Sequence, residues 1–257
     1  MESGLNALDW SPPWYAPWRE AGPAVAARIG AGMPAHEALN RQGGGQAVRF
    51  VPQEALPAGQ AYEQFIFERC ECPTREGLHD FFNGLCWMVF PEAKRQVNRL
   101  QAGQIARYGV GAVRGPVRDA LTVFDENGAL LDAPAPLWDA LVARQWQRLF
   151  VQLRPLWTAA RLVVFGHALL EKLAVPRKDL TAHVWRAPAP LATLAEADRW
   201  LAAQMTEAAL AAKPFVPLPV LGVPGWWPAN TDPVFYDDAT VFRAARRPVR
   251  AGAGGGA

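Results

Sequence analysis

Residues 78–85 have the sequence Leu78-His79-Asp80-Phe81-Phe82-Asn83-Gly84-Leu85, and the apolar pattern continues to Phe90. Apolar residues at this density predict a buried helix over residues 78–90, with Thr74 near its N-terminal cap. His79 and Asn83 are four residues apart and share a face of that helix, whereas Asp80 points about 100° away. Buried polar groups are costly unless they find partners, so this stretch predicts a polar network inside a helical core.

A second polar pair interrupts a second apolar stretch. Residues 157–173 are predicted to form another helix, which contains Phe165-Gly166-His167-Ala168-Leu169-Leu170-Glu171. His167 and Glu171 share one of its faces. Leaving one such group buried and unpaired costs roughly 1–3 kcal/mol. We therefore expect the helices of His79 and His167 to pack together, with their polar residues in direct contact or joined through one water or ion.

Two interpretations of this cluster remain open. In the first, His79, Asp80, His167 and Glu171 form a catalytic or metal-binding cluster. In the second, they form a satisfied network that fixes the register of the helices. The His79-Asp80 pair is also similar to that of metal-dependent phosphohydrolases, but those need a further upstream histidine, and only His36 precedes it. The sequence allows a divalent metal and does not require one.

A candidate anion-binding site lies just before the helix of His79. A helix N-terminus offers free N–H groups and a positive partial charge. Arg75 and Arg118 could add guanidinium donors for a phosphate or carboxylate, whereas Arg114 is expected to be solvated. The ligand-binding candidates are Thr74, Arg75, Asn83 and Arg118.

The stretch around Asn127-Gly128 predicts a β-hairpin. Residues 118–124 form a β-prone run, and residues 129–131 follow the Asn-Gly pair, which is a strong hairpin signal. Such a turn requires positive φ at Gly128. Asp125, Glu126 and Asn127 are accordingly interpreted as turn residues.

Strand alternation makes Asp119 a further candidate. On a strand over residues 118–124, Asp119 shares the apolar face of Leu121 and Val123. A carboxylate there needs a partner, so we expect it to reach Arg75, a lysine or a histidine.

The fold class that these patterns predict is mainly α with one β-hairpin, a small α+β protein. Further helices are predicted over residues 21–41, 92–104, 137–153 and 191–213, and little regular structure over 214–243. We expect residues 1–60 to form a docked arm with a short helix. Residues 61–243 should form one compact helical domain, and residues 244–257 a disordered tail.

Composition limits the classes of function. The chain has 257 residues, with 26 Lys and Arg against 24 Asp and Glu. A net charge of +2 argues against a nucleic-acid or membrane-surface binder. No run of about 18 apolar residues and no signal peptide is visible, so a cytoplasmic location is expected.

The three cysteines form no disulfide framework. A zinc site drawn from Cys70, Cys72, His79 and Cys86 lacks its second pair of ligands. The cysteines are instead expected to be small buried hydrophobic residues.

Several motifs resemble those of one bacterial family of uncharacterised proteins, called domain of unknown function 3025. They are Pro73-Thr74-Arg75, residues 78–83, Phe90-Pro91 with Lys94 and Asn98, residues 118–121 and 124–128, residues 165–169 with Glu171, and residues 217–220, 226, 235–238 and 241–243. The segment Cys70-Glu71-Cys72 lies outside that pattern. The resemblance implies a bacterial, cytoplasmic, single-domain protein and supplies no activity.

The sequence favours a hydrolase-type enzyme that acts on a phosphate- or carboxylate-bearing ligand. The catalytic candidates are His79, Asp80, Asp119, His167 and Glu171. A histidine would act as general acid or base, oriented by an acid. The alternative is a non-enzymatic binding or interaction protein whose polar network is structural. A small anionic ligand is expected, and the substrate, metal and oligomeric state are left open.

Overall fold

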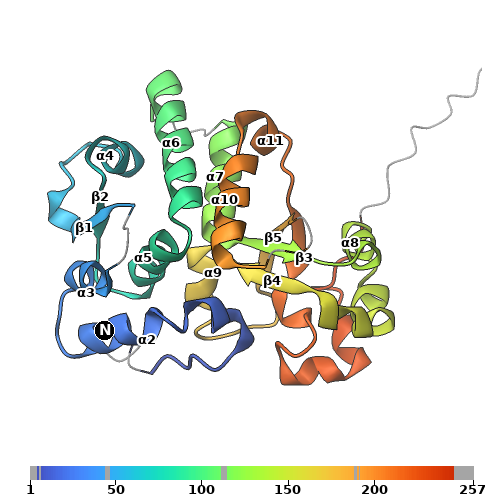
Figure 1. Cartoon of the computed structure of the whole chain (residues 1–257). Coiled ribbons are helices and arrows are strands. Elements are labelled where there is room, and N and C mark those ends of the chain that lie inside the picture. The colour runs from blue at the N-terminus through green and yellow to red at the C-terminus, as the bar shows by residue number, and fades with distance from the viewer. Residues whose placement is uncertain are drawn as a thin grey trace, which may run out of the picture.

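The computed structural model describes residues 5, 7–43, 47–110, 115–187, 190 and 192–245 (Figure 1). Its helices are α2 (Gly22–Gly30), α3 (Ala35–Gln42), α4 (Tyr62–Arg69), α5 (Leu78–Val89), α6 (Pro91–Tyr108), α7 (Pro116–Asn127), α8 (Ala135–Val142), α9 (His167–Lys172), α10 (Leu194–Gln204) and α11 (Glu207–Ala211). Its strands are β1 (Arg49–Pro52), β2 (Glu71–Thr74), β3 (Gly128–Asp132), β4 (Arg161–Val164), β5 (Thr181–Arg186) and β6 (Val216–Pro219). The expected class, mainly helical with some β-structure, is confirmed.

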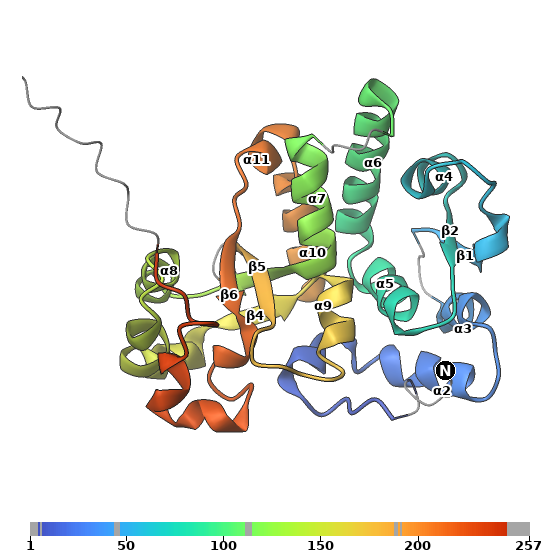
Figure 2. The same ribbon diagram turned by 180° about the vertical axis from the view of Figure 1, so that it is seen from behind.

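The strands form a two-stranded sheet and a four-stranded sheet in the described residues. β1 and β2 pair in parallel, and the larger sheet has the order β4-β3-β5-β6. β3 is antiparallel to β4 and parallel to β5, so its hydrogen-bonding partners come from later in the chain. Figure 2 shows this sheet with α7, α9 and α10 beside it.

The predicted β-hairpin is wrong, because residues 116–127 form helix α7. Proline is tolerated at the first turn of a helix, and Pro116 begins this one. Its buried residues are spaced as on one helix face, at Val117, Ala120, Leu121 and Phe124. This period outweighs the β-propensity of the same residues.

Asn127-Gly128 is therefore the junction between a helix and a strand. Gly128 has φ −74°, not the positive φ that a tight hairpin requires. The position still demands glycine for another reason, since a Cβ there would lie 2.4 Å from the carbonyl oxygen of Phe124.

The predicted helix over residues 157–173 is also wrong in its first half. Residues 161–164 form β4, whose Val163 and Val164 pair with Leu130 and Ala129 of β3. β-branched residues fit a pleated, buried surface better than a helix. His167 consequently stands at the first position of the short helix α9.

Other helices are shorter than expected. The stretch at 21–41 contains two helices, and the one at 137–153 gives α8 and a π-helical turn, Arg148–Gln152. In the stretch at 191–213, Thr206 accepts from the N–H of Ala209 and starts α11 separately, while Leu191 lies outside the described residues. Residues 214–243 include β6.

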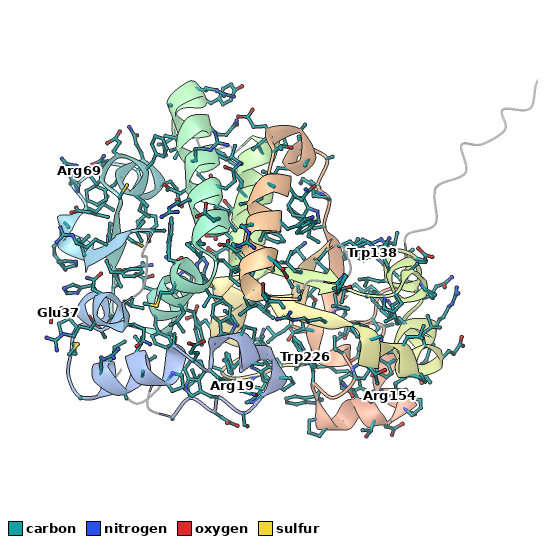
Figure 3. The ribbon with its side chains drawn as sticks, viewed as in Figure 1. Arg19, Glu37, Arg69, Trp138, Arg154 and Trp226 are labelled. Carbon is teal, nitrogen blue, oxygen red and sulfur yellow. The ribbon has the colours of Figure 1, made fainter. Side chains whose placement is uncertain are left out.

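The N-terminal segment packs on the two histidine helices. Tyr15 stacks on Phe82 of α5 at 5.7 Å between ring centroids, and its hydroxyl donates to the carbonyl of Leu170 in α9 at 2.9 Å. Trp14 contacts Trp226 near the other end of the chain, and Figure 3 shows Trp226 where the two segments meet. One aromatic cluster thus holds α5 and α9 together.

The structure describes only part of the predicted C-terminal tail. Residues 246–257 of the predicted tail lie outside the described residues. Within the described part of the chain, no helix combines the length and apolarity that crossing a bilayer requires.

Gly166 sets the distance between α9 and the end of α7. A Cβ at this position would lie 2.5 Å from the backbone nitrogen of Asn127 and 2.5 Å from the carbonyl oxygen of Glu126. Gly166→Ala is therefore expected to lower the free energy of unfolding by about 1–3 kcal/mol, because backbone atoms cannot yield as a flexible side chain does.

Gly103 provides the matched control for this change. It lies within α6, and its Cβ would meet no described heavy atom within 4 Å. Gly103→Ala should raise stability by about 0.5–1 kcal/mol through helix propensity alone. Urea denaturation of both variants measures the difference, and equal stabilities would show that the α7–α9 contact is not tight.

Candidate metal centre

The two predicted histidine helices do pack together. The Nε2 atoms of His79 and His167 lie 3.2 Å apart, and α5 contacts α9 along its length. The expected contact between their polar residues is confirmed. Glu171 does not pair with His167 of its own helix. Its Oε2 instead lies 2.9 Å from Nδ1 of His79 on α5.

A third group, the Glu126 carboxylate, completes a set of metal-ligand types. Donor atoms of His79, Glu126 and His167 all lie within 4.8 Å of one another, and Glu126 Oε1 is 3.8 Å from His167 Nε2. Two ligands of a tetrahedral zinc ion are roughly 3.3 Å apart, given Zn–N bonds of about 2.0–2.1 Å. The 3.2 Å spacing of the two imidazole nitrogens matches that geometry, and Glu126 Oε1, 3.8 Å from His167 Nε2, lies slightly beyond it.

The positions of the protons on the two imidazole rings decide whether their nitrogen lone pairs can bind a cation between them. His79 donates through Nδ1 to Glu171, so its Nε2 presents a lone pair. His167 Nδ1 is buried and has no hydrogen-bond partner in the described structure, and Asp125 Oδ2 lies 3.7 Å away. If the His167 proton is on Nδ1 and faces Asp125, two imidazole lone pairs and the Glu126 carboxylate converge on one point.

The other tautomer of His167 is less satisfactory. A proton on Nε2 would bridge the rings but leave the Nδ1 lone pair buried beside the Asp125 carboxylate. Burial lowers the pKa of His167 to about 4, against the opposing effect of Asp125. The ring is therefore neutral at physiological pH, which is the form that binds metals.

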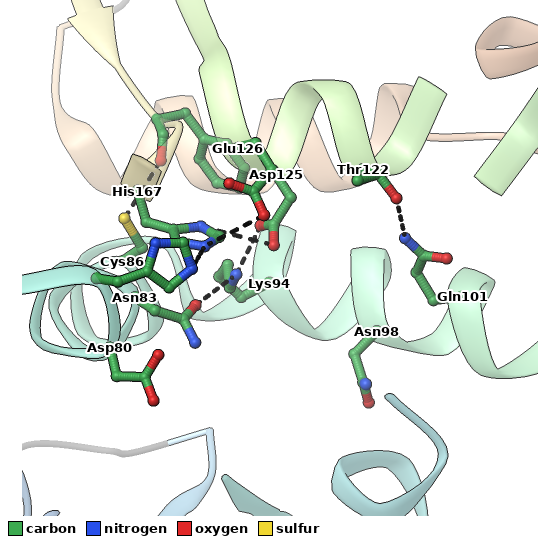
Figure 4. A network of polar contacts seen from close by, with 12 residues as sticks. Asp80, Asn83, Cys86, Lys94, Asn98, Gln101, Thr122, Asp125, Glu126 and His167 are labelled. Atoms are coloured by element: carbon green, nitrogen blue, oxygen red, sulfur yellow. Dashed lines mark hydrogen bonds and ion pairs between the residues drawn. The ribbon is translucent and has the colours of Figure 1, made fainter. Parts of the chain in front are cut away.

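An ion pair between buried Lys94 and partly buried Asp125 lies next to the imidazoles (Figure 4). Lys94 Nζ donates to Asp125 Oδ1 at 2.6 Å and to Asn83 Oδ1 at 2.9 Å. Burial acts to lower the pKa of Lys94, but Asp125 and other anions outweigh it and the net shift is upward. Burial acts to raise the pKa of Asp125, but the charge and the hydrogen bond of Lys94 outweigh it and the net shift is downward. Both groups are charged.

Arg75 and Asp80 are brought to the same cavity but are paired with each other. The Arg75 backbone N–H and its Nε both donate to Asp80 Oδ2, at 2.6 and 3.0 Å. Nη2 donates to Oδ1 at 3.0 Å. The predicted capping role of Thr74 is wrong, because it lies in β2 and donates to the Cys72 carbonyl, while Gly77 precedes α5.

Two predicted site residues lie elsewhere. Asp119 accepts from Lys213 Nζ at 3.0 Å on the protein surface. The expectation that it reaches a lysine is confirmed, but the apolar strand face on which it was placed does not exist. Arg118 lies 3.4 Å from Gln101 Oε1 and is not among the described residues that line the cavity.

The cavity has a volume of about 350 Å³. It is lined by Gln53, Leu56, Tyr62, Glu63, Ile66, Arg75, His79, Asp80, Asn83, Trp87, Lys94, Val97, Asn98, Asp125, Glu126 and His167. From the sequence, Asp125 and Glu126 are expected in a turn, and no sequence signal makes Lys94 or Glu63 a candidate site residue. A helical period through Leu121 would have placed Asp125 on the buried face, four residues further on.

The cysteines do not belong to this centre. Cys72 and Cys86 are buried, as expected, whereas Cys70 is exposed. Cys86 donates to the carbonyl of Phe165 at 3.2 Å, and Cys72 Sγ lies 3.2 Å from the Tyr62 hydroxyl. Burial raises the pKa of Cys72 to about 12, so the thiol is protonated at physiological pH, and none of the three cysteines lines the cavity among the described residues.

Comparison with known proteins gives one match. A family model described as "Protein of unknown function (DUF3025)" matches residues 48–246. No curated protein and no solved structure matches the chain.

Proposed function

The chain belongs to this family of proteins of unknown function, and we propose that it is a metal-dependent hydrolase whose divalent ion is held by His79, His167 and Glu126. The convergence of three ligand atoms within 4.8 Å carries the proposal. Two imidazoles and one carboxylate are the protein ligands of several catalytic zinc sites, which keep one position open for water or substrate.

A divalent ion held by these residues would activate a water molecule for nucleophilic attack. The chain's own groups prepare the rest. Glu171 holds the His79 ring with Nε2 free, through the 2.9 Å bond to Nδ1. Asp125 lies on the opposite side of His167. A carboxylate behind each metal-ligating histidine fixes ring orientation and raises its basicity.

Lys94 is the group we assign to charge stabilisation. Its ammonium has three N–H donors, and the described hydrogen bonds use two of them, to Asn83 and Asp125. The third is available to a substrate oxygen on which negative charge develops. A preorganised donor in a site shielded from water stabilises such a transition state strongly.

The substrate is proposed to be small and to carry a phosphate or carboxylate. The Arg75 guanidinium is paired with Asp80 through two hydrogen bonds, whereas the described hydrogen bonds of Lys94 leave one of its N–H groups unused inside the cavity. We therefore assign the anion to the metal and Lys94 instead of to Arg75. A cavity of about 350 Å³ is at the lower end of the usual range for ligand sites.

Metal analysis of the purified protein tests the proposal directly. We expect about one equivalent of a divalent metal, lost on chelation and restored by zinc, together with metal-dependent hydrolysis in a panel of phosphate and carboxylate esters and amides. Bound iron would indicate oxidative chemistry instead, since the same ligand types serve non-haem iron oxygenases. Failure to bind any metal would favour the alternative, a non-enzymatic protein with a structural network.

Glu171→Gln tests the role of the carboxylate behind His79. The variant should fold normally and bind zinc about 10–100-fold more weakly, because the amide orients and polarises the imidazole less well. Isothermal titration calorimetry with zinc provides the measurement. Glu207→Gln, which changes the surface pair with Arg107, is the control, and equal affinities in both variants would remove Glu171 from the site.

Cysteine content and net charge bear on the location and partners of the protein. The three free cysteines are compatible with a reducing cytoplasm, and the net charge of +2 gives no reason to invoke nucleic acid. We propose that residues 61–243 act as one domain that carries the whole centre.

A further inference from the structure

The charged groups that line the cavity are unevenly matched. Arg75 is paired with Asp80, and Lys94 is paired with Asp125. Two carboxylates of the lining then remain, Glu126 and Glu63. Glu126 belongs to the metal centre, so Glu63 is the acidic group that the proposed chemistry does not use.

Glu63 lies on α4, and α6 fixes its place relative to the centre. Asn98 Nδ2 donates to the Glu63 carbonyl at 2.7 Å and lies 3.3 Å from its Oε2. Asn98 is four residues beyond Lys94 on α6, which corresponds to about 6 Å along the helix axis. Figure 4 shows Asn98 one turn from Lys94, on the side away from His167. Glu63 therefore marks the end of the cavity remote from the imidazoles.

Glu63 is half-buried, and its carboxyl has few partners. Among the described residues, Asn98 is its one hydrogen-bond donor, at the long distance of 3.3 Å. Burial and the nearby Asp125 raise its pKa, whereas Lys94 and Arg118 act in the opposite direction. A carboxylate that is partly withdrawn from water is normally stabilised by several donors or by an opposite charge. A bound cationic group would supply both.

We propose that the substrate is zwitterionic, with an amino group that binds Glu63 at one end of the cavity and an anionic or carbonyl group that meets the metal and Lys94 at the other. This inference rests on the metal centre of the proposed function. A divalent ion with two neutral imidazoles and Glu126 carries a net charge of +1, and the Glu63 carboxyl, held beside Asn98, is the acidic group at the other end of the cavity. The two ends of the site thus match a small molecule with opposite charges at its ends.

Hydroxamic acids provide a probe that does not require the natural substrate. The hydroxamate group binds zinc, and a linear chain of two to five methylenes can carry either a terminal ammonium or a terminal methyl group. Calorimetric titration of the zinc-loaded protein with both series should show, for one chain length, at least about 10-fold tighter binding of the ammonium compound. Glu63→Gln should remove that preference and leave the affinity of the methyl series unchanged.

Two further variants sharpen the assignment. Glu63→Asp withdraws the carboxylate by one methylene, so the preferred ammonium chain should become one methylene longer. Glu68→Gln changes an exposed glutamate on the same helix and should behave like the parent. The aspartate variant also gives a result if the glutamine variant does not fold.

The outcomes separate the inference from the proposed function. If the methyl series binds the zinc-loaded protein without any preference for ammonium, the zwitterion inference is wrong and the metal centre stands. If the ammonium preference persists in Glu63→Gln, another acid recognises the amine and the assignment to Glu63 is wrong. If neither series binds and no zinc is retained, the proposed function itself fails.

Discussion

His167→Gln is expected to leave the protein folded and to abolish stoichiometric metal binding. Glutamine keeps a similar volume and can still hydrogen bond, but it cannot replace the imidazole Nε2 that lies 3.2 Å from His79 Nε2. The loss of zinc affinity should exceed the roughly 10–100-fold that follows from altering groups behind the ligands. Zinc titration and circular dichroism of the purified variant measure both properties.

A double-mutant cycle with His79→Gln separates a metal centre from a structural network. In a metal centre, either single change already removes the site, so the double variant should bind no less metal than each single variant. In a structural network, both single variants should lose stability without any metal dependence, and their effects on the free energy of unfolding should be clearly non-additive. His36→Gln, on α3 and outside the cavity lining, is the control for the substitution itself.

Lys94→Met should cause the largest loss of stability, about 3–5 kcal/mol. Lys94 is only 3% exposed, and removing it leaves the Asp125 carboxylate buried without its 2.6 Å partner. Methionine fills a similar volume, so the loss measures the uncompensated charge and not a cavity. Chemical denaturation in the presence of a chelator gives the free energy of unfolding without a contribution from metal.

Combining Lys94→Met with Asp125→Asn tests this cause. Because the double variant buries no unpaired charge, its loss should fall short of the sum of the single losses by up to about 3 kcal/mol. Lys213→Met removes a pair of the same chemistry at the surface, where Lys213 and Asp119 are 60% and 50% exposed. It should cost no more than about 1 kcal/mol. Similar losses for Lys94→Met and Lys213→Met would contradict the role given to the buried pair.

The half of the centre formed by the two histidines was predictable from local sequence. Helix α5 follows from a strongly apolar stretch that His79 interrupts, and His167 interrupts a second such stretch. The cost of burying an unpaired polar group then requires them to find partners. The prediction depends only on burial, which a run of apolar neighbours indicates. It succeeded although residues 161–164 of the helix predicted around His167 form strand β4.

The acidic half of the centre was not predictable in the same way. Asn127-Gly128 is a strong local signal for a hairpin, and it assigned Asp125 and Glu126 to a turn. The helical spacing of apolar residues over 116–127 favours a helix instead of the first hairpin strand. Which of the two forms depends on which strand pairs with β3. That partner is β4, about thirty residues later, with β5 on the other side. Strand pairing depends on surfaces that are remote in sequence, so no local window contains it.

The sequence by itself therefore settled which helices are buried and that their histidines must meet, because apolar spacing and the cost of an unpaired polar group are local properties. Tertiary structure alone decided which charges accompany them. Gly166 lets α9 approach the backbone of Glu126 and Asn127, and α6 brings Lys94 to Asp125 from another part of the chain. The strength of an interaction between two charges depends on their distance and burial in the folded state. Neither quantity can be derived from the spacing of residues along one helix or strand.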